Sequence, residues 1–69
     1  SRGSYRVTDP FHEHATLLDG QLALTDETTG QTMVYGPGDS WIIAKGTTVL
    51  WDIRSDGIRK SYLAVTVDL

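Results

Sequence analysis

Three polar side chains in this sequence are candidates for chemistry: Glu13, Lys60 and Tyr62. A carboxylate can act as a general base, while an ammonium or a phenol can act as a general acid or donate a hydrogen bond to a developing oxyanion. Lys60 and Tyr62 alternate with Ser61 in a β-rich run, so they share one face of the predicted strand. These three residues are therefore our candidate catalytic residues for an isomerase or hydrolase acting on a small polar metabolite.

Glu13 is predicted to point into an apolar interior, because Phe11, Ala15 and Leu17 share its face of a strand. An unpaired buried carboxylate is costly, so a cationic partner is expected, and Lys60 is the best candidate. Such a pair can be purely structural or can form the polar end of a ligand pocket. The sequence leaves both possibilities open.

Val49 and Trp51 share a face of another predicted strand and are expected to line the same interior. Carboxylate, ammonium, phenol and indole groups around one cavity would suit a small polar ligand with an apolar body. Core packing is the simpler interpretation of both Trp41 and Trp51. The candidate binding set is Glu13, Val49, Trp51, Lys60 and Tyr62.

His12 and His14 share one strand face and could in principle hold a metal ion together. Glu13 lies between them and so projects from the opposite face, which leaves two imidazoles without a third ligand. The interpretation we favour places both histidines on the outer face of a sheet, at an oligomer contact or in hydrogen bonds.

Turn-forming residues recur about every ten positions, a rhythm typical of an all-β sandwich or barrel. Pro37 and Gly38 suit a type II turn, after which Asp39 can accept a local backbone N–H. Trp41-Ile42-Ile43 is apolar on both faces, so we expect it to be covered on both sides. The predicted strands are 5–8, 11–18, 21–26, 31–35, 40–44, 48–53 and 59–67.

Composition limits the class of protein to one small domain over residues 1–69. The net charge of −3 and a pI near 5.0 argue against a nucleic-acid surface. No apolar run approaches the roughly 20 residues of a membrane span, and the polar start is unlike a signal peptide. The absence of Cys fits a reducing compartment, so a cytoplasmic protein is expected.

Small size also makes a homodimer the expected assembly. A core built from 69 residues is marginal in isolation, and no disulfide can reinforce it because Cys is absent. An open sheet edge pairs readily with another chain, and the strand predicted at Tyr5–Thr8 is the one we expect at the contact.

The order of these motifs resembles the cupins. Their first motif ends in Glu, six residues and Gly, as do Glu13 and Gly20 here; the second has Gly-Asp, a strand and a turn glycine, as do Gly38-Asp39 and Gly46. The downstream Trp51 and the Lys60-x-Tyr62 strand narrow the resemblance to small RmlC-like cupins related to ureidoglycine aminohydrolase and ethanolamine-utilisation cupins. The resemblance implies a double-stranded β-helix, a small jelly-roll barrel. Relatives usually carry a further strand before this point, so we expect a barrel that is short at its N-terminal side.

The resemblance also implies where a cupin metal site would lie. The two histidines of the common first motif fall near Val7 and Asp9, and that of the second motif falls at Val49. A valine side chain cannot ligate a metal, and one or two carboxylates are a poor transition-metal site. We therefore expect no metal and no cofactor, and favour binding of a small polar metabolite over catalysis with Glu13 as base, with or without a metal.

Overall fold

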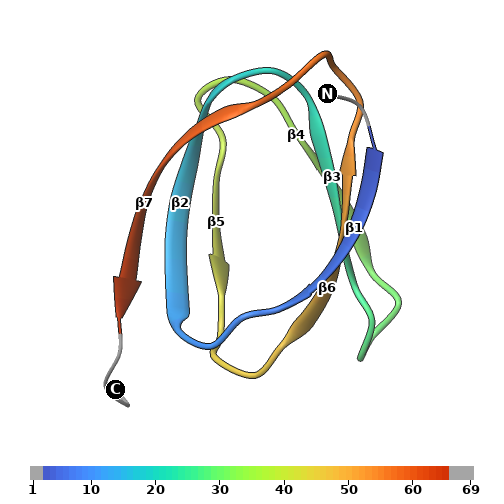
Figure 1. Ribbon diagram of the computed structural model, residues 1–69, viewed down its shortest axis with the longest axis vertical. Coiled ribbons are helices and arrows are strands. Elements are labelled where there is room, and N and C mark those ends of the chain that lie inside the picture. The colour runs from blue at the N-terminus through green and yellow to red at the C-terminus, as the bar shows by residue number, and fades with distance from the viewer. Residues whose placement is uncertain (1–2, 66–69) are drawn as a thin grey trace.

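A computed structural model describes residues 3–65, with side chains described as far as Tyr62. Within this range the chain is all-β, with seven strands and no helix (Figure 1). No helix in this part of the chain is therefore long and apolar enough to cross a membrane. The strands are β1 (Gly3–Thr8), β2 (His12–Asp19), β3 (Leu22–Asp26), β4 (Thr32–Tyr35), β5 (Ser40–Ile43), β6 (Thr48–Ile53) and β7 (Arg59–Val65).

All seven predicted strands are present, and their ends differ from the prediction by at most two residues among the described positions. The predicted end of the last strand, Val67, lies outside the described residues. Pro37-Gly38 forms the expected turn: Gly38 has a φ of 92°, and the backbone N–H of Gly36 donates to Asp39 Oδ2 at 2.8 Å.

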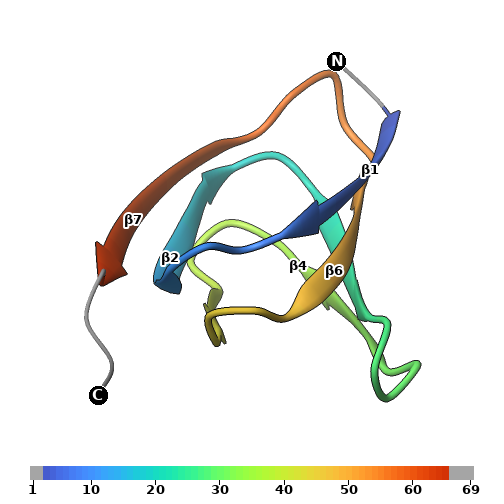
Figure 2. The same ribbon diagram turned by 60° about the horizontal axis from the view of Figure 1, so that its bottom comes forward.

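The strands form two antiparallel sheets that face each other, a four-stranded sheet in the order β1-β6-β3-β4 and a three-stranded sheet in the order β5-β2-β7. The chain moves repeatedly from one sheet to the other, as in a jelly roll (Figures 1 and 2). The core between the sheets consists of Ala15, Leu17, Leu22, Leu24, Trp41, Ile43, Val49 and Trp51.

The strand register sets which side chains face this core. On β2, Ala15 and Leu17 are buried, so Glu13, two positions before Ala15, projects from the same face. On β6, Val49 and Trp51 are buried and lie opposite Val7 and Tyr5 of β1. The predicted inward direction of Glu13 and Val49 is therefore confirmed.

Two packing predictions are wrong. Ile42 is 78% exposed, because it projects from the outer face of β5, which no other described strand covers; only Trp41 and Ile43 of this run are buried. Phe11 is 40% exposed rather than packed beside Glu13. Since β2 begins at His12, Phe11 belongs to the connection from β1 and does not follow the alternation of the strand.

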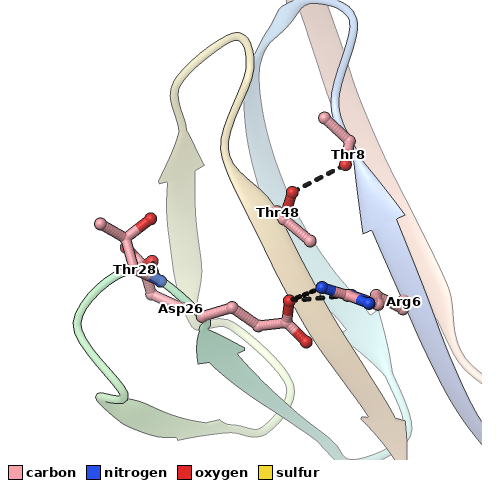
Figure 3. A network of polar contacts seen from close by, with 6 residues as sticks. Arg6, Thr8, Asp26, Thr28 and Thr48 are labelled. Atoms are coloured by element: carbon pink, nitrogen blue, oxygen red, sulfur yellow. Dashed lines mark hydrogen bonds and ion pairs between the residues drawn. The ribbon is translucent and has the colours of Figure 1, made fainter.

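Two polar contacts on the outer face of β1 attach this strand to the rest of the larger sheet (Figure 3). Arg6 pairs with Glu27, which follows β3, with Nη2 and Oε2 2.8 Å apart. The hydroxyls of Thr8 and Thr48 are hydrogen-bonded at 2.7 Å. These contacts keep the inner face of β1, with Tyr5 and Val7, turned toward the space between the sheets.

Gly20 and Gly38 are both turn glycines with positive φ, but only Gly20 is also closely surrounded by other atoms. Both have positive φ, 98° and 92°, which costs an L-residue roughly 1–2 kcal/mol. A Cβ on Gly20 would also lie 2.5 Å from the carbonyl oxygen of Gly57, whereas a Cβ on Gly38 meets no atom within 4 Å. The β2–β3 turn is thus packed against the β6–β7 connection.

We expect Gly20→Ala to lower the free energy of unfolding by more than Gly38→Ala, which should lose only the roughly 1–2 kcal/mol of backbone strain. Urea denaturation of the two variants measures the difference. Equal losses would contradict the close packing of Gly20 against Gly57.

Candidate functional site

A cavity of about 310 Å³ opens on the side of the sandwich where β1 and β7 are the outer strands of their sheets. Four strands and the β1–β2 connection contribute to its wall. Three charged groups and several apolar or aromatic side chains therefore meet in one open pocket. Its lining residues are Tyr5, Val7, Asp9, Glu13, Trp51, Ile53 and Lys60.

Glu13 lines this wall, and each of its two carboxylate oxygens accepts a hydrogen bond from another side chain. Oε1 accepts a hydrogen bond from the indole Nε1 of Trp41 at 3.1 Å, and Oε2 lies 3.2 Å from Lys60 Nζ. The side chain of Glu13 is 13% exposed and that of Lys60 is 25% exposed. The structure thus contains the expected pairing of Glu13 with Lys60, and it adds an indole donor that the sequence did not indicate.

Lys60 is held from three sides. Besides the carboxylate of Glu13, its Nζ lies 4.5 Å from the centroid of the Trp51 ring and 5.0 Å from that of Tyr62. Cation–π contacts of this kind stabilise an ammonium where water is partly excluded. The Trp51 ring in turn meets Trp41 edge to face, with centroids 5.8 Å apart. The ion pair and the two indoles therefore form one connected unit across the sandwich.

Asp9 is the second carboxyl group of the cavity. Its backbone is fixed on the β5–β6 connection: Asp9 N–H donates to Thr47 O at 3.2 Å, and Gly46 N–H donates to Asp9 O at 2.8 Å. The residue is only 9% exposed, and its Oδ2 has no hydrogen-bond partner among the described residues. Burial, and then the negative charge of Glu13, raise the pKa of Asp9, while Lys60 lowers it by less.

The residues of the predicted binding set do not all line the same cavity. Glu13, Trp51 and Lys60 line the charged cavity, but Val49 lines a different cavity, of about 350 Å³, beside Trp41. Tyr62 shares the Lys60 face of β7 but is 62% exposed and is not part of either cavity wall. In the sequence, only the resemblance to cupins marks Asp9, as the residue near a histidine position of their first motif.

The two histidines do not build a metal centre in the described part of the chain. His12 Nδ1 accepts a hydrogen bond from the backbone N–H of Lys45 at 3.1 Å, and His14 is exposed. Within residues 3–65, no three His, Cys, Asp or Glu side chains come together as a metal site.

Comparison with known proteins identifies the family. Residues 1–62 match the family described as EutQ-like cupin domain. No curated protein matches the sequence significantly. Among solved structures, the chain is similar to a protein of unknown function from Rhizobium leguminosarum bv. viciae 3841, with a TM-score of 0.84 and 25% identity over 93% of the chain.

Two further structures show the same fold. A putative ethanolamine utilization protein Q from Salmonella typhimurium LT2 has a TM-score of 0.80 and 26% identity over 96% of the chain. A DUF861 family protein from Thermotoga maritima has a TM-score of 0.84 and 23% identity over 93% of the chain. This chain spans 60% of the Rhizobium protein, 51% of the Salmonella protein and 70% of the Thermotoga protein.

Removing either partner of the Glu13–Lys60 pair should lower the free energy of unfolding by more than removing both partners. Lys60→Met leaves a carboxylate largely buried without its cation, whereas Glu13→Gln/Lys60→Met leaves no charge. We expect a coupling free energy of about 1–2 kcal/mol from a double-mutant cycle in urea.

The exposed Arg6–Glu27 pair is the matched control for this cycle, because its side chains are 71% and 31% exposed. Pairs of this type contribute roughly 0.2–1 kcal/mol. A coupling in the Glu13–Lys60 cycle no larger than that of Arg6–Glu27 would show that the central pair does not organise the site.

Asp9 should lower the stability of the protein as the pH rises. Because the pKa of Asp9 is raised above its ordinary value of 3.8, the folded state retains this proton to higher pH than the unfolded state. The resulting penalty is absent below pH 3.8 and complete above the raised pKa. Asp9→Asn should therefore increase the melting temperature at pH 7 and change it little at pH 3.5.

Thermal melts of Asp9→Asn across this pH range measure the effect. Asp52→Asn removes a carboxylate that is 42% exposed and paired with Arg54, and serves as the control. A gain for Asp9→Asn that is equally large at low pH would rule out ionisation of Asp9 as its cause.

Proposed function

Because the chain belongs to the EutQ-like cupin family, we propose that it binds a small polar metabolite in the cavity between β1 and β7 without a transition metal. The observation that carries this proposal is the Glu13–Lys60 pair, which lies in the wall of an open cavity rather than deep in the core. A pair that served only to connect strands would have no need to border such a space.

The composition of the wall supports small-molecule binding. Ligand sites are typically concave, about 300–1,000 Å³ in volume, and mostly apolar with a few polar groups that orient the ligand. This cavity of about 310 Å³ combines Tyr5, Val7, Trp51 and Ile53 with three charged side chains. A ligand with a polar head and an apolar body would match both parts.

The residues at the cupin ligand positions do not fit a transition metal. Val7 offers no donor atom, and Val49 lies on the wall of the other cavity. Asp9 and Glu13 are the two remaining carboxyl groups, and Glu13 already accepts from Trp41 and Lys60. Two oxygen donors without imidazole or thiolate are a weak set for zinc, nickel or iron.

An isomerase or hydrolase with Glu13 as base is the alternative. Glu13 faces a cavity, and Lys60 Nζ is a proton donor 3.2 Å away. Protonation of Glu13 would, however, abolish the ion pair that holds Lys60 in place, and Tyr62 does not reach the cavity wall. These contacts favour a role for Glu13 and Lys60 in building the cavity wall over a catalytic one.

We also propose that the protein is a homodimer with β1 at the contact. β1 is an edge strand of its sheet, so one of its edges has no neighbouring strand among the described residues. A free strand edge favours pairing with another copy of the chain.

Native mass spectrometry tests these points in one experiment. We expect a dimer mass, no transition-metal adduct, and a small-molecule adduct after incubation with a mixture of polar metabolites. Glu13→Gln should retain the dimer and lose the adduct, because it removes the carboxylate that holds Lys60 in the cavity wall, while Glu27→Gln on the outer surface should retain both. A near-stoichiometric zinc, nickel, iron or manganese adduct, or the absence of any small-molecule adduct, would overturn the proposal.

A further inference from the structure

We propose that the ligand of this cavity carries a cationic amino group that donates a hydrogen bond to Asp9 Oδ2, with its apolar body against Tyr5, Val7 and Trp51. This inference rests on the proposed function and names the chemical class of the ligand. It assigns the recognition of the ligand head group to Asp9 rather than to Glu13.

Asp9 Oδ2 is one of two buried polar atoms of the wall that have no hydrogen-bond partner among the described residues. The other, Trp51 Nε1, is a donor, so Asp9 Oδ2 is the atom that a donor from a ligand would satisfy. Two backbone hydrogen bonds fix the main chain of Asp9 on the β5–β6 connection, at Thr47 and Gly46. The residue is nonetheless only 9% exposed, and its Oδ2 is buried without a partner among the described residues. A buried oxygen without a donor costs free energy, which a donor from a ligand would recover.

Glu13 is unavailable for the same role. Its Oε1 accepts from Trp41 Nε1 and its Oε2 from Lys60 Nζ, so each oxygen already has a donor of the protein. Lys60 likewise has Glu13 and the rings of Trp51 and Tyr62 around its ammonium group. A ligand that approached either residue would have to displace an existing contact.

The charges in the cavity favour a cation. With Asp9 ionised, Asp9 and Glu13 carry two negative charges and Lys60 carries one positive charge, so the wall is left with one uncompensated negative charge. Tyr5 is the remaining titratable side chain of the wall. Consistent with this imbalance, the charge of Glu13 adds to burial in raising the pKa of Asp9, and Lys60 offsets them only partly.

An anionic ligand would be repelled by the charges of the wall. It would face two carboxylates at close range, and the ammonium of Lys60 is already paired with one of them. A neutral alcohol could donate to Asp9 Oδ2 but would leave the negative charge uncompensated. A charge-assisted hydrogen bond is roughly twice as strong as a neutral one, so a cationic head should be preferred over a hydroxyl.

The rest of the wall indicates the shape of the ligand. Tyr5, Val7, Trp51 and Ile53 provide aromatic and aliphatic surfaces beside the charged groups, in a space of about 310 Å³. An amine with a small ring or a short branched chain would place its apolar body on these side chains. Benzylammonium is a suitable probe, since benzyl alcohol and benzoate have the same ring and differ only in the head group.

The experiment compares binding of these three probes to the intact protein by two-dimensional NMR titration at pH 7. We expect benzylammonium to bind about tenfold or more tightly than benzyl alcohol, and benzoate to bind weakest. Lowering the pH until Asp9 is protonated should weaken benzylammonium binding by more than that of benzyl alcohol, because only the amine loses the attraction between opposite charges.

Two variants with the same loss of charge locate the effect. Asp9→Asn should reduce the affinity for benzylammonium to that for benzyl alcohol, while Asp52→Asn, on the outer surface, should leave the preference intact. The pH series on the unaltered protein gives the same information if Asp9→Asn does not fold.

The outcomes separate this inference from the proposed function. If benzyl alcohol or benzoate binds as tightly as benzylammonium, or if Asp9→Asn keeps the preference for the amine, the cavity binds small molecules but Asp9 does not select a cation. If none of the three probes perturbs the cavity residues at millimolar concentration, both proposals fail. Binding of calcium or magnesium ions that excludes benzylammonium would make Asp9 part of a cation site instead.

Discussion

A carboxylate placed between two sheets needs hydrogen-bond donors, and the way Glu13 obtains them organises the rest of this structure. Trp41 comes from one neighbouring strand of β2 and Lys60 from the other, so the three strands of the smaller sheet are joined through one side chain. Trp51 belongs to the larger sheet, and its ring contacts both the ammonium of Lys60 and the ring of Trp41. The polar centre is therefore also the contact between the sheets.

The two carboxyl groups of the cavity show how position along the chain determines role. Glu13 lies on the central strand of its sheet, where both neighbouring strands can supply donors. Asp9 lies in the connection between β1 and β2, where its backbone is hydrogen-bonded to the β5–β6 connection but its Oδ2 has no donor among the described residues. One carboxylate is consequently satisfied within the protein, and the other lines the cavity and keeps one oxygen without a donor among the described residues.

The same open side that leaves Asp9 unpaired makes the cavity accessible. β1 and β7 are the outer strands of their sheets, and the cavity lies between their inner faces. The Arg6–Glu27 pair and the Thr8–Thr48 hydrogen bond keep β1 attached to the larger sheet although one of its edges is free. An open barrel side thus coexists with a wall whose side chains have fixed directions.

The sequence by itself determined the strands, the turns and the direction of single side chains, because these depend on local alternation and on residues such as Gly38 that tolerate positive φ. It also indicated the pairing of Glu13 with Lys60 through the cost of a buried charge. Only the tertiary structure decided which strands are neighbours. That choice supplied Trp41 as a donor, left Ile42 uncovered at a sheet edge, and placed Val49 and Trp51 on different cavities although they share one face of β6. Contacts between strands distant in sequence are not encoded in a local period of two, which is why these features could not be predicted.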